Sequence, residues 1–192
     1  MHMKKIFTLF LCLLFTGCLG CSSSPPAPVT WGEDDLSVTQ VSSQATVTYG
    51  MTRAEIEQIV GEERGVSTAS TTKDDSIYYG NLYVGYRDDM AAELVIESDA
   101  YRTSKGITIG DTKEEVERRC GETDYTRGTI IVGSTSYLMQ YLFDQEGNLI
   151  PEDNIPDQIT TSNDFYTVSF EFEKNRVVRV RICDARFSFS RT

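Results

Sequence analysis

Histidine is almost missing from this sequence, since the only one among the 192 residues is His2. His2 lies in an N-terminal segment that we expect to be removed, so the mature chain holds no imidazole. That absence excludes Ser–His and Cys–His nucleophile pairs, histidine general bases and histidine zinc sites. No glycine loop of the kind that cradles phosphates occurs either. We therefore expect no enzymatic activity, no cofactor and no metal.

Basic residues are also scarce. The chain has 18 Lys and Arg against 29 Asp and Glu, a net charge of −11. Removal of Lys4 and Lys5 with the N-terminal segment leaves 16 against 29, or −13. Such an acidic chain repels phosphate groups, which excludes nucleic acid as a partner. Its own charge also does not hold it at anionic lipid headgroups.

A long apolar run occurs at the N-terminus. Lys4 and Lys5 precede an uncharged stretch from Ile6 to Phe15, and small residues then lead to Cys18. This order is typical of a secretory signal peptide, and the run is too short for a permanent membrane span. We expect residues 1–17 to be the signal peptide of an exported protein.

The end of this segment, "LFTGC", resembles the lipobox of bacterial lipoproteins, in which the cysteine becomes acylated. Cys18 fits the motif better than Cys21, which stays open as the alternative. Two or three acyl chains on one cysteine give durable anchoring, where a single chain is marginal. We expect the lipid to anchor the protein to the cell membrane or the outer membrane, with its domain facing the outside or the periplasm.

Residues 18–45 follow as the lipidated cysteine and a tether. The stretch "SSSPPAPVTWGEDD" is Pro-rich and then acidic, without apolar periodicity, which is typical of a flexible linker. Within it we favour Trp31 as a solvated or interfacial aromatic, with docking on the folded domain as the alternative.

The remaining chain contains an internal repeat. The segment "VTYGMTRAEIEQIVGEE", which starts at Val47, is similar to "ITIGDTKEEVERRCGET", which starts at Ile107. In each copy a threonine followed three residues later by glutamate predicts a helix N-terminus, and a glycine predicts its end. The repeat signature consists of Gly50, Thr52, Glu55 and Gly61, and of Gly110, Thr112, Glu115 and Gly121.

Strand patterns follow both helices. Alternating apolar residues flank polar turns at residues 87–90 and 173–176, which predicts a hairpin in each copy. The second copy adds an expected extra strand at 137–143 and a loop. We predict an α+β fold of two tandem repeats, 46–100 and 101–192, each a short helix packed on an antiparallel sheet.

Two groups of carboxylates are candidates for a metal site and for a catalytic pair. Asp144, Glu146 and Asn148 alternate as in a calcium loop, but Gly147 is misplaced for an EF-hand and a plain hairpin turn is favoured. Asp88 and the aspartate after it are an acid–base pair in principle. They fall in a predicted turn, which makes a hydrolase the weakest of the functions considered.

The phrase "GMTRAEIEQIVGEE" and its copy resemble the opening of the SmpA/BamE lipoproteins and, equally, the repeat unit of the tandem-repeat β-lactamase inhibitory proteins. The resemblance covers both helices well and the strands by pattern alone. It departs where the families usually have proline, since Glu63 and Thr123 stand there. It implies an inhibitor-like α+β protein whose sheet face serves as a docking surface.

Tyrosines are frequent on the predicted strands, and tyrosine is favoured at protein interfaces. Alternation places half of them in the core. We expect Tyr79, Tyr83 and Tyr141 to form a partner-binding face. The favoured function is a non-catalytic lipoprotein that binds an envelope or extracellular protein through this face. The alternative is a small-molecule or cell-wall-fragment binder that uses the groove between the repeats.

Cys120 and Cys183 remain for pairing. Cys120 ends the second helix and should face the sheet, while strict alternation turns Cys183 to the opposite side of the last strand. Export permits a disulfide, but the register argues against one. We predict two free thiols.

Overall fold

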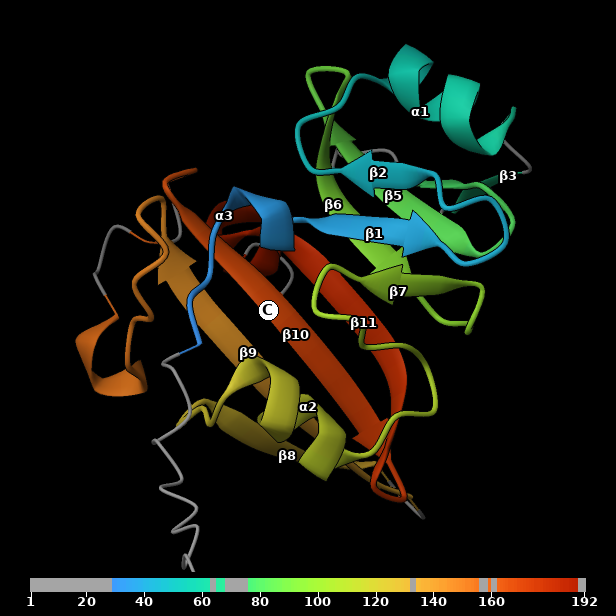
Figure 1. Cartoon of the computed structure of the whole chain (residues 1–192). Helices are drawn as coiled ribbons and strands as arrows, with labels where there is room; N and C mark the ends of the chain where they lie inside the picture. The colour runs from blue at the N-terminus through green and yellow to red at the C-terminus, as the bar shows by residue number, and fades with distance from the viewer. Residues whose placement is uncertain are drawn as a thin grey trace, which may run out of the picture.

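The structure is a computed structural model that describes residues 29–62, 65–67, 76–131, 134–155, 159 and 162–189. The expected signal peptide, Cys18 and Cys21 lie outside these residues. The described chain is an α+β fold of antiparallel sheets and short helices (Figure 1), which confirms the α+β part of the prediction. Among the described residues no helix has the length and apolarity to span a membrane.

The helices are short and the strands numerous. The α-helices are α1 (Arg53–Val60), α2 (Lys113–Cys120) and α3 (Ala185–Phe189), and the 3-10 helices are η1 (Glu33–Asp35) and η2 (Glu152–Asn154). The strands are β1 (Ser37–Gln40), β2 (Thr46–Thr48), β3 (Gly65–Ser67), β4 (Ser76–Tyr78), β5 (Leu82–Arg87), β6 (Met90–Ile96), β7 (Tyr101–Thr103), β8 (Thr126–Ile131), β9 (Ser134–Asp144), β10 (Phe165–Glu173) and β11 (Arg176–Asp184).

The large sheet has eight strands in the order β3-β4-β5-β6-β11-β10-β9-β8. Its centre is the antiparallel pair β6 and β11, in which Leu94 lies opposite Ile182 and Ile96 opposite Val180. The strands β3 to β6 come after α1, and β8 to β11 come after α2. One continuous sheet therefore joins segments that are about ninety residues apart in the chain.

A second sheet of three strands, β2-β1-β7, lies on the same side of the large sheet as α1 and α2 (Figure 1). Between these layers lies one hydrophobic core, which contains Ile56 of α1, Val116 and Cys120 of α2, and Val38 of β1, all at most 1% exposed. Helices of eight residues are too short to persist alone, so this shared core holds both of them in place.

The expected tether is wrong for its last part. Residues 37–40 form β1, the central strand of the small sheet. Trp31 is 5% exposed, and its ring stacks on Tyr141 and Phe143 at centroid distances of 4.7 and 5.3 Å. Lys105 lies over the same indole at 4.5 Å. Composition suggested a linker because the packing partners of Trp31 lie more than seventy residues away.

The helix starts agree with the sequence, with one difference. Thr52 and Glu55 form both halves of the predicted capping box. Thr112 also caps its helix by accepting a bond from the backbone N–H of Glu115. The Glu115 carboxylate turns instead to the guanidinium groups that follow it on α2. The corresponding positions on α1 hold no arginine, so Glu55 stays free to cap.

Gly61 and Gly121 end the two helices as predicted, with φ of 87° and 83°. Their ψ values, −179° and 175°, place them in an extended region that only glycine adopts easily, rather than in the left-handed helical region.

The hairpins have equivalent irregularities. Ala92 has no partner across β5, and Val178 has none across β10, because each sits in a β-bulge. Beyond the bulge Val177, rather than Val178, lies in the core together with Val180. A bulge adds one residue and shifts the alternation, which a strict period of two does not anticipate.

The region 137–148 also differs in part from the prediction. β9 fills the position in the second half of the sheet that β4 fills in the first, so it is not an extra strand. The added residues follow it. The Asp144 carboxylate accepts bonds from the backbone N–H and side-chain amide of Asn148, and Phe143 bridges to Leu149. This confirms the predicted turn.

Cys120 and Cys183 are free thiols, as predicted. Cys120 belongs to the main core, whereas Cys183 packs with Ala92 and Phe187 on the other side of the large sheet. The alternation of β11 separates the two sulfurs, so the register argument gave the right result.

Candidate binding face

We call the side of the large sheet away from α1, α2 and the small sheet the outer face. In β6 the core side chains are Leu94 and Ile96, so Glu93 and Val95 point to the outer face. In β11 the core side chains are Val180 and Ile182, which turns Arg179 and Arg181 outward. The outer face thus carries charged residues on the two central strands.

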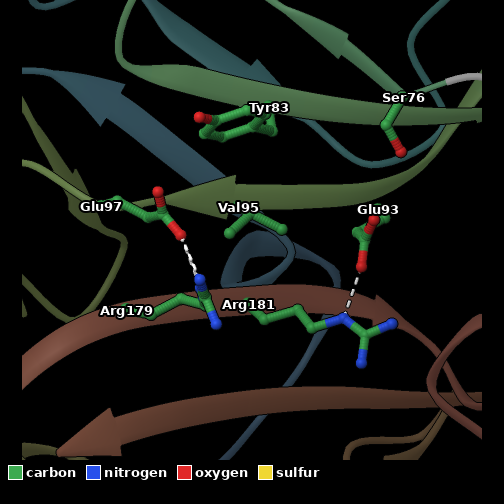
Figure 2. Close-up of a pocket in the computed structure, with 7 residues that line it drawn as sticks. All are labelled: Ser76, Tyr83, Glu93, Val95, Glu97, Arg179 and Arg181. Carbon is green, nitrogen blue, oxygen red and sulfur yellow. Dashed lines mark hydrogen bonds and ion pairs between the residues drawn. The ribbon is translucent and has the colours of Figure 1, made fainter. Parts of the chain in front are cut away.

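A groove of about 470 Å³ lies on this face over the β6–β11 pair. We call it the central groove. Its lining residues come from both halves of the sheet and point toward a common space (Figure 2): Ser76, Tyr83, Glu93, Val95, Glu97, Arg179 and Arg181. Because β6 and β11 meet only through the tertiary fold, neither half contains this groove alone.

Strand register arranges the lining in rows. Tyr83 of β5 lies opposite Val95 of β6, which lies opposite Arg181 of β11. Beside Tyr83, the ring of Tyr78 packs at a centroid distance of 4.7 Å. The groove therefore has an aromatic edge on the β4–β5 side and an arginine edge on the β11 side.

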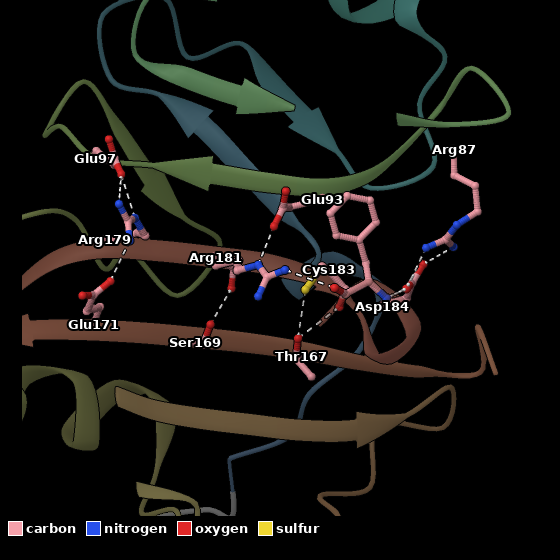
Figure 3. Close-up of polar contacts among 11 residues, drawn as sticks. Arg87, Glu93, Glu97, Thr167, Ser169, Glu171, Arg179, Arg181, Cys183 and Asp184 are labelled. Carbon is pink, nitrogen blue, oxygen red and sulfur yellow. Dashed lines mark hydrogen bonds and ion pairs between the residues drawn. The ribbon is translucent and has the colours of Figure 1, made fainter. Parts of the chain in front are cut away.

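Both arginines of the groove form ion pairs with carboxylates of neighbouring segments (Figure 3). The Arg179 Nε donates to Glu97 Oε1 at 2.7 Å, and its Nη1 donates to Glu171 Oε2 at 2.9 Å. Arg181 pairs with Glu93 and also donates to the backbone carbonyl of Phe187. Each guanidinium is held by a neighbouring strand, so its position is fixed before any ligand arrives.

Exposure separates the two pairs. The Glu93 side chain is 2% exposed and that of Arg181 is 21% exposed, so this pair mainly stabilises the β6–β11 contact. The side chains of Arg179 and Glu97 are 48% and 37% exposed. The second pair is the part of the groove that a ligand can reach.

Helix α3 lies on the outer face beside the groove, where the Phe187 carbonyl accepts a bond from Arg181. The Phe187 ring packs over Gly85, where a Cβ atom would lie only 2.6 Å from its Cζ. Asp184, fully buried, accepts a bond from the Phe187 backbone N–H and pairs with Arg87 at 2.6 Å. Tyr49 donates its hydroxyl to the same carboxylate at 2.8 Å, and burial together with the Asp184 charge raises the pKa of Tyr49. These contacts fix α3 at the groove.

Two of the three expected partner-binding tyrosines are in the core. Tyr79 is 5% exposed, and its hydroxyl lies 2.9 Å from that of Tyr86. Tyr141 is fully buried and donates to the Gly121 carbonyl at 2.7 Å. Tyr83 is the one that lines the groove. The placement of Tyr79 and Tyr141 on a surface was wrong because both rings belong to the main core. Tyr79 follows the end of β4, and Tyr141 on β9 is covered by Trp31, which the sequence placed in a tether.

The charged lining residues were not predicted. A signal exists in "ELVIE", which puts Glu93, Val95 and Glu97 on one side of a strand, and in "RVR", which does the same for Arg179 and Arg181. The pairing of these two segments has no local signature.

The described residues hold no cluster of three or more His, Cys, Asp or Glu side chains suited to a metal ion. Among their buried carboxylates, Glu93 and Asp184 each pair with an arginine.

Comparison with known proteins assigns no family. No family model matches the chain, and no curated protein matches it. Three solved structures are similar. They are an extracellular protein containing a SCP domain from Bacillus anthracis (10% identity, TM-score 0.47), the DUF4309 family protein YjgB from Bacillus subtilis (14%, 0.37) and a "putative beta-lactamase inhibitor protein" from Streptococcus mutans (10%, 0.27).

The aligned regions are extensive but distant. They cover 74%, 69% and 77% of this chain, in the same order, and 46%, 78% and 91% of the similar chains. This chain therefore spans less than half the length of the Bacillus anthracis protein. At these identities and TM-scores the similarities assign neither a family nor a function.

Proposed function

We propose that this chain is an exported, lipid-anchored protein without catalytic activity, which binds an envelope or extracellular protein through its outer face. The observation that carries the proposal is the central groove, where Tyr83, Glu97 and Arg179 lie open on a rigid sheet. Tyrosine and arginine are the residues that protein interfaces favour, because both combine contact area with hydrogen bonds.

Rigidity supports the same interpretation. Arg179 is already held by Glu97 and Glu171, so binding costs little side-chain entropy there. The groove is open and mostly polar rather than a closed apolar chamber, which favours a protein surface over a small hydrophobic ligand.

We also propose that the fold consists of two tandem repeats. In its support, the bridges Thr52 to Met90 and Thr112 to Arg176 join each helix N-terminus to the turn of the corresponding hairpin. The bulges at Ala92 and Val178 occupy corresponding positions, four residues before Ile96 and Ile182. The central groove then lies where the repeats meet.

The N-terminal sequence supports export and anchoring, because an apolar run precedes Cys18. An anchored binding protein stays close to the membrane, within reach of other envelope proteins.

Site-specific photo-crosslinking tests the proposal. A benzophenone amino acid replaces Tyr83 on the outer face or, as the matched control, Gln58, which is exposed on α1 across the molecule. In native membranes we expect a discrete cross-linked protein from position 83 and none from position 58. Equal products from both positions, or a product from 58 alone, would contradict binding through the outer face.

The second candidate is a binder of small molecules or cell-wall fragments. The groove volume of about 470 Å³ favours it, since it falls in the range of ligand sites. Soluble cell-wall fragments should then raise the melting temperature of the chain, and a Val95→Arg variant that fills the groove should remove that rise.

A further inference from the structure

We infer that the central groove takes a basic side chain, a lysine or arginine presented by the protein partner on an extended segment or loop. The inference rests on the proposed function and specifies the chemistry of its site. It follows from three properties of the groove: its charge balance, its uncommitted hydrogen-bonding groups and its aromatic edge.

The charges around the groove sum to a negative value. Arg179 and Arg181 balance the lining carboxylates of Glu93 and Glu97, and Glu171 of β10, which pairs with Arg179 beside the lining, adds one further negative charge. Since the whole chain carries −11, the surrounding field has the same sign. An acidic partner would meet repulsion at long range, whereas a basic one is attracted.

The carboxylates beside Arg179 keep uncommitted acceptor atoms. All three nitrogens of Arg179 contact a carboxylate oxygen, with Nε and Nη2 on Glu97 Oε1 and Nη1 on Glu171 Oε2. Glu97 Oε2 and Glu171 Oε1 take no bond from any residue that the structure describes. These side chains are 37% and 30% exposed, so an incoming N–H donor can reach them. Each nitrogen of Arg179 thus already faces a carboxylate oxygen, and carboxylate lone pairs remain for an incoming donor.

The aromatic edge suits a cation as well. The Tyr83 ring borders the groove opposite the arginine edge (Figure 2), and the Tyr78 ring supports it. A cation between Tyr83 and Glu97 gains a cation–π contact and a charge-assisted hydrogen bond together. Arg53, placed over the Tyr86 ring at 4.8 Å, shows the same kind of contact within this chain.

A defined probe tests the inference without the native partner. The full chain in detergent is titrated with a fluorescein-labelled peptide of alternating lysine and serine, and with one of alternating glutamate and serine. We expect the lysine peptide to bind, more weakly as salt rises, and the glutamate peptide not to bind.

Two variants localise the binding. Glu97→Gln should weaken the lysine peptide about tenfold, and Tyr83→Leu about fivefold. Glu62→Gln is the matched control, because it removes the same charge from an exposed residue next to α1. Equal affinities of the Glu97 and Glu62 variants would reduce the binding to general acidic attraction and overturn the inference.

A measurement on the unaltered chain covers the case of a poorly folded variant. Carbodiimide joins a bound lysine amine directly to a contacting carboxylate, and peptide mapping should find the link at Glu97 or Glu171. Links spread over exposed carboxylates such as Glu62 would overturn the inference. A cross-linked dimer of this chain that is lost in Glu97→Gln would also overturn it, because the groove would then bind a second copy rather than a partner. In a further outcome, a native partner is captured at position 83 and binds the Glu97→Gln variant with unchanged affinity. That result would contradict the inference but not the proposed function.

Discussion

At the scale of single residues, Arg179 shows how a long charged side chain becomes part of a fixed surface. Its β11 strand lies between β6 and β10, and the guanidinium reaches Glu97 just beyond β6 on one side and Glu171 of β10 on the other. Exposed ion pairs contribute little to stability. Their effect here is to hold the guanidinium and the two carboxylates in one geometry for a ligand.

The two core cysteines allow a prediction on reactivity. Burial raises the pKa of Cys120 to about 12 and that of Cys183 to about 11, so both remain protonated near neutral pH. We expect iodoacetamide to leave both unmodified in the native chain and to alkylate both in guanidinium, with or without reductant. Peptide mass mapping reads each site separately. A linked Cys120–Cys183 peptide, or alkylation of the native chain, would show the prediction to be wrong.

Trp31 allows a prediction on stability. Its indole packs on Tyr141 and Phe143 in a well-filled core, so Trp31→Ala should lower the free energy of unfolding by about 3 kcal/mol. Urea unfolding followed by far-ultraviolet circular dichroism measures the loss. Trp31→Phe keeps a stacking ring and should lose markedly less. If both variants matched the unaltered chain, the segment would not belong to the core.

At the scale of elements, the two main hairpins share one turn geometry. Asp88 and Asp89 have φ of 51° and 65°, and Lys174 and Asn175 have φ of 49° and 63°. Two consecutive positive φ values are the mark of a type I′ turn, which matches the twist of the strands on either side. Aspartate and lysine adopt this conformation less easily than Asn-Gly does.

Replacing Asp88-Asp89 by Asn-Gly should therefore stabilise the chain by about 1 kcal/mol in denaturant unfolding. The lost contact between Arg53 and Asp89, 3.4 Å long with the Asp89 side chain 67% exposed, offsets little of this gain.

The same change at Lys174-Asn175 is the matched comparison. There Asn175 accepts a bond from Tyr137 and donates to Glu114, and glycine removes both contacts. The second turn should gain less than the first. An equal gain at both turns would mean that these hydrogen bonds do not stabilise the fold.

At the scale of the whole molecule, the large sheet has one covered side and one open face. The small sheet, α1 and α2 cover the core side (Figure 1), and the outer face keeps its central strands accessible. This asymmetry is what makes a binding function the natural proposal, since an antiparallel sheet with one covered face presents the other.

Anchoring is predicted at the same scale. Metabolic labelling with an alkyne fatty acid should mark the full chain and a Cys21→Ala variant, and should not mark Cys18→Ala. The Cys18→Ala chain should also leave the membrane fraction, because one acylated cysteine is its anchor. Label retained by Cys18→Ala would assign the lipid to Cys21. Label retained when both are replaced would contradict lipidation at either cysteine.

Local patterns in the sequence determined a good part of this fold. The caps at Thr52 and Thr112, the helix ends at Gly61 and Gly121, and the turn at Asp144 each depend on residues within a few positions of one another. The opposite faces of Cys120 and Cys183 followed from strand alternation. Such features are encoded locally, because helix and strand periods and capping bonds act over one or two turns of chain.

The tertiary structure alone decided the site. Glu97 and Arg179 are 82 residues apart and meet only because β6 pairs with β11. Trp31 enters the core only because Tyr141 and Phe143 lie beneath it. A segment's own periodicity states which side is apolar and not which distant segment will lie against it, since that choice depends on the packing of the whole chain.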